Sequence, residues 1–350
     1  PMNSGRKKIY AGLDVGKFAC AFFILFYHYF SEHGPLPEIL DEMLSLYAVA
    51  VALFMTISGF LLFDKLETVD DGKARWEIVK KQAIRIYRIY LIWSIPYLIF
   101  NISRWDWNTI SLEFIFWQIQ GWIFKSTFYT IWFMPVLAIG LILTFWITEK
   151  FSKEIAVLLA IICWIIGALL STYNFIGIKI PNFTTFSIFA DTWMGGARGW
   201  TFYAFPLLMV GRFMVKVKNH MRPMQMVLLS CICMLVLLGE ALLLRFLAGG
   251  HTGIDLAMMM IPTVFCVLGF LISIPLPKNG PYVWMRKMST LVFMSQRIFL
   301  TVLPAMFPAV FAAIFQQKYI GGILVVAFVY ITGESIILGA SRYKMMKLLY

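Results

Sequence analysis

Long apolar segments alternate with short polar ones along most of the chain. Ten of them are long enough to cross the hydrocarbon core of a membrane, which is about 30 Å thick. They are residues 11–30, 45–63, 83–101, 130–148, 154–172, 199–215, 225–247, 254–276, 289–310 and 319–340. Residues 102–129 instead mix Trp and Tyr with polar groups, which predicts a helix in the membrane interface or a re-entrant segment. The pattern predicts an all-α polytopic membrane bundle of about ten transmembrane helices.

The composition supports this interpretation. Of the 350 residues, 61% are hydrophobic and 14% are charged, whereas soluble domains are about 45–50% apolar and about 25% charged. The net charge of +12 would also suit a nucleic-acid-binding protein, but the basic residues lie between the apolar segments, as membrane topology requires. We therefore expect a membrane protein with no nucleic-acid partner.

The basic residues are concentrated in alternate loops. One set of loops carries Arg6, Lys7, Lys8, Lys65, Lys73, Arg75, Lys80, Lys81, Lys150, Lys153, Lys216, Lys218, Arg222, Lys278, Arg286, Lys287, Arg342, Lys344 and Lys347. The opposite loops carry only Arg104, Lys125, Lys179, Arg198 and Lys318. Because cytoplasmic loops are enriched in Lys and Arg, the asymmetry places both termini in the cytoplasm. We expect one membrane domain over residues 1–350.

The first apolar segment contains two ionisable groups on one side of the predicted helix. Lys17 and His28 are eleven residues apart, so they share a face and lie roughly 16 Å apart along the axis. Asp14 lies close to the same stripe and can pair with Lys17. The ordinary explanations are that Lys17 reaches the inner interface and that His28 belongs to an interfacial aromatic belt. The functional one is that His28, the only histidine in an apolar segment, performs acid–base chemistry.

The second and third apolar segments supply further candidates. Ser58 and Gly59 are small, which allows close packing of another helix or the approach of a thin ligand. Arg85 and Arg88 are three residues apart and share a helix face. Guanidinium groups bind phosphate through charge and paired hydrogen bonds, although such residues also act as topology anchors. Arg297 falls near the middle of its segment and therefore needs a partner or a polar cavity.

The cysteines do not indicate a metal site. All five lie within apolar segments, at positions 20, 163, 231, 233 and 266, and none has zinc-ligand spacing. We interpret them as small buried hydrophobic residues and expect no metal.

Several of these segments resemble the acyltransferase-3 family of bacterial integral membrane acyltransferases. LDVGKFACAFFILFYH is similar to the family's basic-residue-x10-His signature, ALFMTISGFLLF to its Ser-Gly-Phe element and AIRIYRIYLIW to its Arg-x-x-Arg stretch. Three later elements, TIWFMPVLAIG, RGWTFYAFPLLMVG and RKMSTLVFMSQRIF, follow in the family's order. The last departs from the pattern, since Phe293 and Gln296 stand where Tyr and His are usual. Gln296 forms hydrogen bonds but does not titrate.

The resemblance implies a reaction that uses residues at both ends of the first helix. It implies a cytoplasmic acyl-CoA donor whose phosphates Arg85 and Arg88 would hold, and a catalytic His28 that acts as general base or acyl relay near the outer end. Lys17 would polarise the donor or hold an acidic partner. The donor would pass Ser58 and Gly59, and Trp132 would form a wall of the site, unless it is a belt residue.

The resemblance also sets the expected substrates and one alternative. The acyl group is expected to be acetyl, the acceptor a hydroxyl of a cell-surface sugar, and the location a bacterial plasma membrane. The family also includes the membrane part of vancomycin-resistance serine racemases, so transport of a small substrate such as serine is the alternative. Against transport, the sequence lacks paired Gly- or Pro-broken segments in matching halves.

Overall fold

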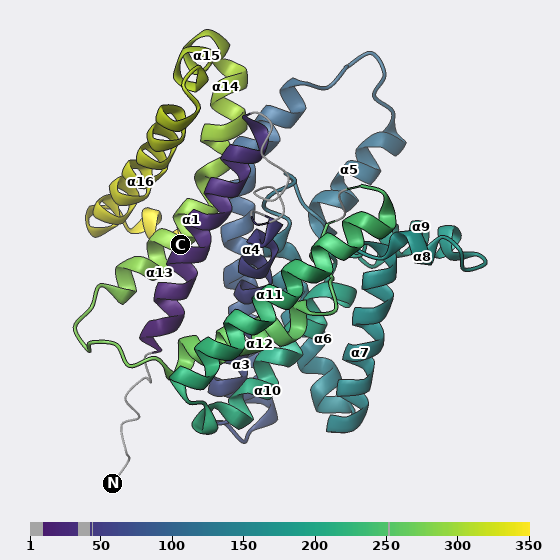
Figure 1. The fold of residues 1–350 in the computed structure, drawn as a ribbon. Coiled ribbons are helices and arrows are strands. Elements are labelled where there is room, and N and C mark those ends of the chain that lie inside the picture. The colour runs from purple at the N-terminus through teal and green to yellow at the C-terminus, as the bar shows by residue number, and fades with distance from the viewer. Residues whose placement is uncertain (1–9, 34–42, 44, 251–252) are drawn as a thin grey trace.

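The computed structural model describes residues 10–33, 43, 45–250 and 253–350, and its regular elements in these ranges are all helices (Figure 1). Eight of the helices described there are long and apolar enough to cross a membrane. They are α1 (Ala11–Glu32), α3 (Tyr47–Leu66), α4 (Gly72–Ser103), α6 (Phe133–Lys150), α7 (Lys153–Leu170), α11 (Pro223–Ala248), α13 (Tyr282–Arg297) with its continuation to Met306, and α16 (Lys318–Arg342). The predicted polytopic helical bundle is confirmed.

The other two predicted spans are shorter helices with irregular beginnings. Residues 199–215 form the π-helix η1 (Trp200–Ala204) followed by α10 (Phe205–Val217), and residues 254–276 contain α12 (Met260–Ser273). Glu240 of α11 accepts hydrogen bonds from the backbone amides of Met258 and Met259, at 2.7 and 2.9 Å. The carboxylate thus satisfies amides at the start of α12 that have no partner within the helix.

Short helices form the remaining connections. They are α5 (Leu112–Phe124), α8 (Asn174–Gly177), α9 (Phe183–Trp193), the 3₁₀-helix η2 (Lys218–His220), the π-helix η3 (Ile298–Val302), α14 (Leu303–Met306), α15 (Pro308–Phe315) and the 3₁₀-helix η4 (Lys344–Leu349). In α5 no residue is buried, and Trp117 and Ile119 are exposed. A helix is confirmed within 102–129, and its location in the membrane interface stays a prediction.

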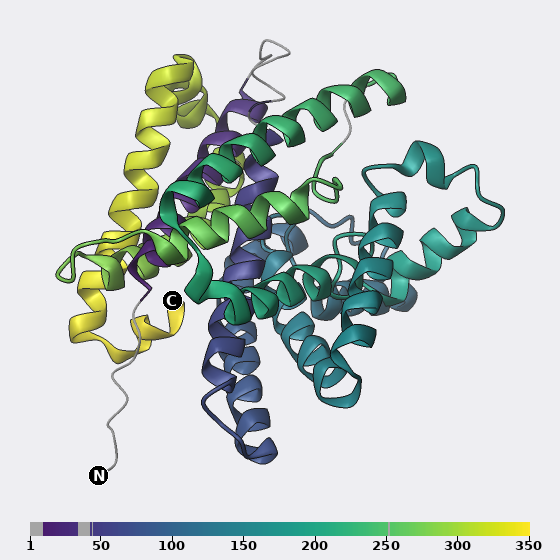
Figure 2. The same ribbon diagram turned by 60° about the horizontal axis from the view of Figure 1, so that its bottom comes forward.

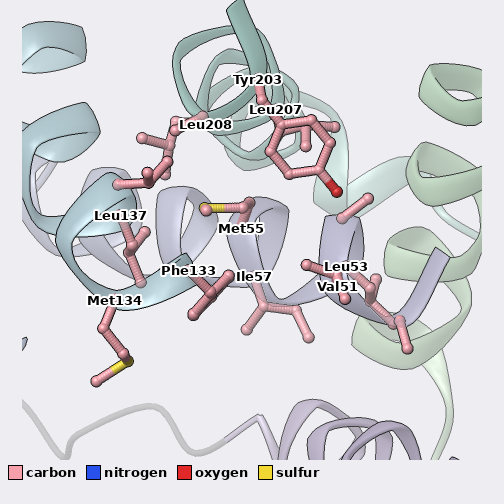
Figure 3. Packing of buried hydrophobic residues seen from close by; sticks show 14 of the residues in the cluster. Val51, Leu53, Met55, Ile57, Phe133, Met134, Leu137, Tyr203, Leu207 and Leu208 are labelled. Carbon is pink, nitrogen blue, oxygen red and sulfur yellow. The ribbon is translucent and has the colours of Figure 1, made fainter. Parts of the chain in front are cut away.

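Helix α3 forms the centre of the bundle. Among the eight candidate spans it has the largest buried share, 72%, and its side chains pack against those of α6, η1 and α10 (Figure 3). The contact with α10 is close because both helices offer a glycine. A Cβ atom on Gly59 would lie 2.6 Å from the carbonyl oxygen of Leu208, and one on Gly211 would lie 2.2 Å from that of Thr56.

Helices α1 and α13 lie side by side in both views, with α16 packed against α13 (Figures 1 and 2). The two run parallel, since Asp14 near the start of α1 pairs with Arg286 near the start of α13, and Glu32 at the end of α1 pairs with Arg297 at the end of α13. We call the end of the bundle that carries Asp14 and Arg286 the basic face and the opposite end the His28 face. That the basic face is cytoplasmic stays a prediction, and Arg6, Lys7 and Lys8 lie outside the described residues.

The segment after α16 folds back onto the bundle. Its helix η4 contacts α4 and α16, and the indole Nε1 of Trp93 in α4 donates a hydrogen bond of 3.0 Å to the carbonyl oxygen of Leu349. The ammonium group of Lys287 lies 5.0 Å from the ring centre of Tyr350, within cation–π range. This segment therefore covers the side of α4 between the two ends of the bundle.

Candidate active site

His28 is held by a buried arginine from a distant part of the chain. Arg297, at the junction of α13 and η3, donates a hydrogen bond of 2.8 Å from Nη2 to Nδ1 of His28. Its Nη1 forms an ion pair with Oε1 of Glu32, one turn further along α1. The Arg297 side chain is only 1% exposed, whereas that of Glu32 is 35% exposed. The mid-segment arginine that the sequence singled out thus has an imidazole and a carboxylate as partners.

A tyrosine completes this arrangement. The guanidinium carbon of Arg297 lies 4.4 Å from the ring centre of Tyr129, which suits a cation–π contact. The Tyr129 hydroxyl donates a hydrogen bond of 3.4 Å to Oε1 of Glu32. Tyr129 precedes α6 and lies outside the spanning helices; burial raises the pKa of its hydroxyl, so it remains protonated and able to donate. We call His28, Glu32, Tyr129 and Arg297 the His28 cluster.

The contact with Arg297 determines which nitrogen of His28 carries a proton. A guanidinium group only donates hydrogen bonds, so Nδ1 of the neutral imidazole is the acceptor and Nε2 carries the hydrogen. In this arrangement His28 can donate from Nε2 to an oxygen atom. To accept a proton at Nδ1, His28 must first lose the hydrogen bond from Arg297, for which Glu32 offers an adjacent alternative partner.

A second group of charges lies at the basic face. Arg286 forms two hydrogen bonds with Asp14, from Nε to Oδ1 at 2.7 Å and from Nη2 to Oδ2 at 2.6 Å. Lys17 lies near enough to Asp14, Arg286 and Arg85 for charge–charge interactions with all three. Arg85 interacts in the same way with Arg88. We call these five residues the basic cluster. Four cations share one carboxylate there, which favours an anionic ligand.

The structure thus brings together several residues that the sequence singled out separately. Lys17 joins Arg85 and Arg88 in the basic cluster, and His28 lies at the other end of α1. The expectation that Asp14 can pair with Lys17 gives way to the bidentate pair with Arg286. The sequence indicates only a loop charge at Arg286, because its distance from α1 along the chain gives no sign of contact.

The α1 surface between the two clusters is packed in this conformation. Ala21 and Ile24, which share the stripe of Lys17 and His28, are 0% and 1% exposed. Ala21 packs in a cluster with Met288 and Val292 of α13. A donor that followed this stripe would therefore require α1 and α13 to move apart.

The remaining predicted residues occupy different surroundings. Gly59 faces α10, as described above, and the Ser58 hydroxyl donates a hydrogen bond of 2.7 Å to the carbonyl oxygen of Phe54 in the preceding turn. Trp132 lies edge-to-face against Tyr203, with ring centres 5.6 Å apart. The roles in donor binding predicted for these three residues stay predictions.

Gln296, which replaces a usual histidine of the resembled family, is a fully buried residue of α13. Its Nε2 donates a hydrogen bond of 3.0 Å to the carbonyl oxygen of Phe293, while its Oε1 has no partner in the described part of the chain. Phe293 lies 5.7 Å from Phe133 and 6.0 Å from Phe54, measured between ring centres. The Gln296 amide is therefore buried with one acceptor atom unused among the described residues.

Comparison with known proteins places these features in a family. Residues 10–338 match the acyltransferase domain that defines the acyltransferase-3 family. The chain belongs to this family. Membership supports a membrane acyltransferase in general, with the motif-bearing helices α1, α3, α4 and α13 inside the matched range.

Two proteins of Enterococcus faecalis, each named amino-acid racemase, are similar to the chain. One is 25% identical over 213 residues, which make up 60% of this chain and 30% of that protein. The other is 23% identical over 274 residues, or 76% of this chain and 36% of that protein. The chain thus spans about a third of the length of these relatives. No solved structure matches it.

Proposed function

We propose that this protein is a membrane O-acyltransferase that moves an acyl group, most simply acetyl, from acyl-CoA at the basic face to a hydroxyl group at the His28 face. The observation that carries the proposal is the presence of two distinct clusters at opposite ends of α1 and α13. One is rich in cations, as a nucleotide phosphate site requires. The other contains a half-buried imidazole held by a guanidinium group, and an imidazole is the side chain most often used for acid–base chemistry.

In the proposed reaction the basic cluster binds the donor. Arg85 and Arg88 hold the CoA phosphates through charge-assisted hydrogen bonds, and Lys17 and Arg286 add positive charge beside them. Trp132 and the small residues Ser58 and Gly59 line the path of the acyl group. The pairing of Asp14 with Arg286 keeps the cations in place while no donor is bound.

His28 performs the proton transfer. The hydroxyl oxygen of the acceptor attacks the thioester carbonyl carbon, and the carbon–sulfur bond breaks. His28 takes the hydroxyl proton after Arg297 has moved onto Glu32, and it then gives that proton to the departing CoA sulfur. The hydrogen on Nε2 stays in place during this transfer and can stabilise the oxyanion that forms on the carbonyl oxygen. Arg297 would thereby couple binding of the substrates to the readiness of the base.

The proposed setting is a bacterial plasma membrane, with the basic face in the cytoplasm and the acceptor on the outer side. The test uses purified protein in detergent or liposomes with acetyl-CoA and a hydroxyl acceptor, N-acetylglucosamine or methyl α-D-glucopyranoside. Thermal stability reports donor binding, and release of the CoA thiol reports turnover. We expect stabilisation of the wild type by acetyl-CoA, and a loss of thiol release in His28→Ala while the donor still stabilises that variant.

A matched control is His220→Ala, which removes a histidine from the loop helix η2, far from the cluster in sequence and outside the spanning helices. This variant should keep wild-type turnover. Retained turnover in His28→Ala would remove His28 from the mechanism. Absence of both stabilisation and thiol release in the wild type would contradict the acyltransferase.

Transport of a small amino acid is the second candidate function. It is favoured by the relatives named amino-acid racemase and by Gln296, whose unused oxygen suits a substrate contact better than proton transfer. In this case proteoliposomes would accumulate radiolabelled L-serine without acetyl-CoA, and the uptake would fall in Gln296→Leu. An acyltransferase would show no such uptake.

A further inference from the structure

The segment after α16 fills a space between α4 and α13. The two helices touch directly at one level, where the hydroxyl of Tyr97 in α4 donates a hydrogen bond of 2.6 Å to the carbonyl oxygen of Met294 in α13. We call this the α4–α13 contact. Nearer the basic face the helices are bridged by residues 343–350, which we call the strap. Figure 2 shows the strap in yellow, turning back from the end of α16 toward the bundle.

The strap contacts both helices on the basic side of the α4–α13 contact. Trp93 lies four residues before the tyrosine of that contact and on the same helix face, and its Nε1 donates a hydrogen bond of 3.0 Å to the carbonyl oxygen of Leu349. Lys287 lies seven residues before the methionine of that contact, with its ammonium group 5.0 Å from the ring centre of Tyr350. The strap thus occupies the space roughly 6 to 10 Å from the α4–α13 contact along the helices.

Leu349 and Tyr350 lie next to the basic cluster. Lys287 directly follows Arg286, whose guanidinium is paired with Asp14 of α1. On α4, the nearer arginine of the cluster precedes Trp93 by five residues, or roughly 8 Å along the axis. The three arginines of the cluster are exposed, so an anion can reach them while the strap stays in place. The strap lies between these cations and the interior of the bundle.

The strap is attached by few contacts and can move without the long helices. Leu349 and Tyr350 pack against the main hydrophobic core, whereas Lys344, Met345 and Lys347 are exposed. The helix η4 within it is a 3₁₀-helix, whose hydrogen-bond geometry is poorer than that of an α-helix. Segments with exposed backbone and few buried contacts open at a low cost in free energy. Opening of the strap would uncover the space between α4 and α13.

The two parts of an acyl-CoA molecule suit this arrangement. Its phosphates lie at one end, and its thioester lies at the far end of a long, thin pantetheine arm. With the phosphates at the exposed arginines, the arm meets Leu349 and Tyr350 before it can enter between α4 and α13. The alternative way along α1 requires two spanning helices to separate, as described above. Displacement of a short segment is the smaller rearrangement.

We propose that the strap is an internal inhibitor of donor entry. Leu349 and Tyr350 close the passage between α4 and α13, and the pantetheine arm of acyl-CoA displaces them. A ligand that needs the open state has an apparent affinity reduced in proportion to the open fraction, so loosening the strap should tighten donor binding. This inference rests on the proposed function, because it concerns regulation of the donor site of that reaction.

The test compares two ligands by isothermal titration calorimetry of the purified protein in detergent. Acetyl-CoA has the pantetheine arm, whereas adenosine 3′,5′-bisphosphate has phosphates on the same nucleoside without the arm. Trp93→Phe removes the hydrogen bond to Leu349 and keeps a ring, and Tyr350→Ala removes the contact with Lys287. We expect each variant to bind acetyl-CoA about 3- to 10-fold more tightly than the wild type. Adenosine 3′,5′-bisphosphate should bind equally to all three proteins.

The matched controls are Trp117→Phe and Tyr319→Ala, which change an exposed tryptophan of α5 and an exposed tyrosine of α16. Both should bind the two ligands as the wild type does. The inference is overturned if Trp93→Phe and Tyr350→Ala bind acetyl-CoA no more tightly than the controls. It is also overturned if their affinity for both ligands rises equally, because the change would then lie at the cations and not in the path of the arm.

A second measurement uses the wild type alone. Trypsin cleaves after lysine, and cleavage after Lys344 or Lys347 requires η4 to open. Acetyl-CoA should speed this cleavage, followed by mass spectrometry, and adenosine 3′,5′-bisphosphate should not. Slower cleavage with acetyl-CoA would show that the strap closes over the donor, which contradicts an inhibitor.

The two proposals fail in distinguishable ways. If Trp93→Phe and Tyr350→Ala bind acetyl-CoA more tightly but no protein releases the CoA thiol with an acceptor present, the strap stands and the acyltransferase is wrong. If thiol release depends on His28 while both strap variants keep wild-type affinity for acetyl-CoA, the reaction stands and the inhibitor is wrong. If acetyl-CoA binds to none of the proteins, both are wrong.

Discussion

Arg297 donates a hydrogen bond to Nδ1 of His28, and the two residues are 269 positions apart in the chain. The contact joins the end of α13 to the end of α1, and the same guanidinium is paired with Glu32. It therefore defines the tautomer of the imidazole and its orientation at once. In the proposed mechanism, proton transfer by His28 depends on Arg297, which lies at the opposite end of the bundle from the basic cluster.

We predict that Arg297→Met lowers turnover by about 10- to 100-fold while acetyl-CoA still stabilises the protein. The physical reason is that His28 loses its positioning partner, and a hydrogen bond to a charged group contributes about 1.5–3 kcal/mol. The same loss should lower the unfolding temperature. Arg297→Lys should recover part of the stability, because an ammonium group can keep one of the two contacts but lacks the planar fork.

Thiol release and thermal unfolding measure the two effects separately. Arg342→Met, at the exposed end of α16, is the control for loss of a charge. Full turnover in Arg297→Met would show that the contact with His28 is structural only.

A second prediction concerns the donor. Replacing Arg85 and Arg88 together with Ala should weaken acetyl-CoA binding by about tenfold or more, since each arginine offers charge-assisted hydrogen bonds to phosphate. The remaining binding should depend less on salt, because fewer charges are screened. Titration by thermal shift at low and high salt measures both. Arg222→Ala with Lys278→Ala removes two charges from other loops and should leave affinity unchanged; equal weakening there would assign the effect to net charge.

A third prediction concerns Asp14, the carboxylate of the basic cluster. Asp14→Asn should lower the free energy of unfolding by about 2 kcal/mol, because Arg286 loses one of its two hydrogen bonds and the negative charge that offsets the neighbouring cations Lys17 and Arg85. An anion can replace the lost charge. We therefore expect adenosine 3′,5′-bisphosphate to stabilise Asp14→Asn more than the wild type in thermal unfolding. Equal stabilisation of both proteins would separate Asp14 from the anion site.

A fourth prediction distinguishes helix packing from ligand contact at Gly59. Gly59→Ala should destabilise the protein by about 1–3 kcal/mol, since the new Cβ meets the backbone of Leu208. Gly239→Ala is the matched control, because a Cβ there meets nothing within 4 Å, and it should stabilise α11 slightly. Chemical denaturation in detergent gives the stability of each. A Gly59→Ala protein with wild-type stability but a raised KM for acetyl-CoA would instead favour a place in the donor path.

The positions of the long helices, and the residues that share one face of α1, can be predicted from the local pattern of apolar and polar residues. Hydropathy found every long helix, and the helical period put Lys17 and His28 on one stripe. The irregular starts were not predictable: η1 is a π-helix next to a tight glycine turn, and α12 begins late because Glu240, on another helix, holds the amides before it.

The partners of the candidate residues could not be read from the sequence, because they come from distant segments. The sequence predicts that Arg297 needs a partner, but nothing local points to His28 or Glu32. Asp14 had a plausible neighbour in Lys17 one turn away, and the structure pairs it with Arg286 instead. From the sequence, Gly59 is compatible with close helix packing or with the approach of a thin ligand. Only the position of α10 shows that its neighbour is the backbone of Leu208.

The parallel contact of α1 with α13 has a consequence for biogenesis. The two ion pairs between these helices, Asp14–Arg286 and Glu32–Arg297, join residues that are 272 and 265 positions apart in the chain. During synthesis α1 enters the bilayer with a carboxylate near each end long before α13 leaves the ribosome. A charged group in hydrocarbon is costly, so α1 must stay near the insertion machinery or in a hydrated site until its arginines arrive. We therefore expect the contact of α1 with α13 to form late in assembly of the newly made chain, after α13 has been inserted.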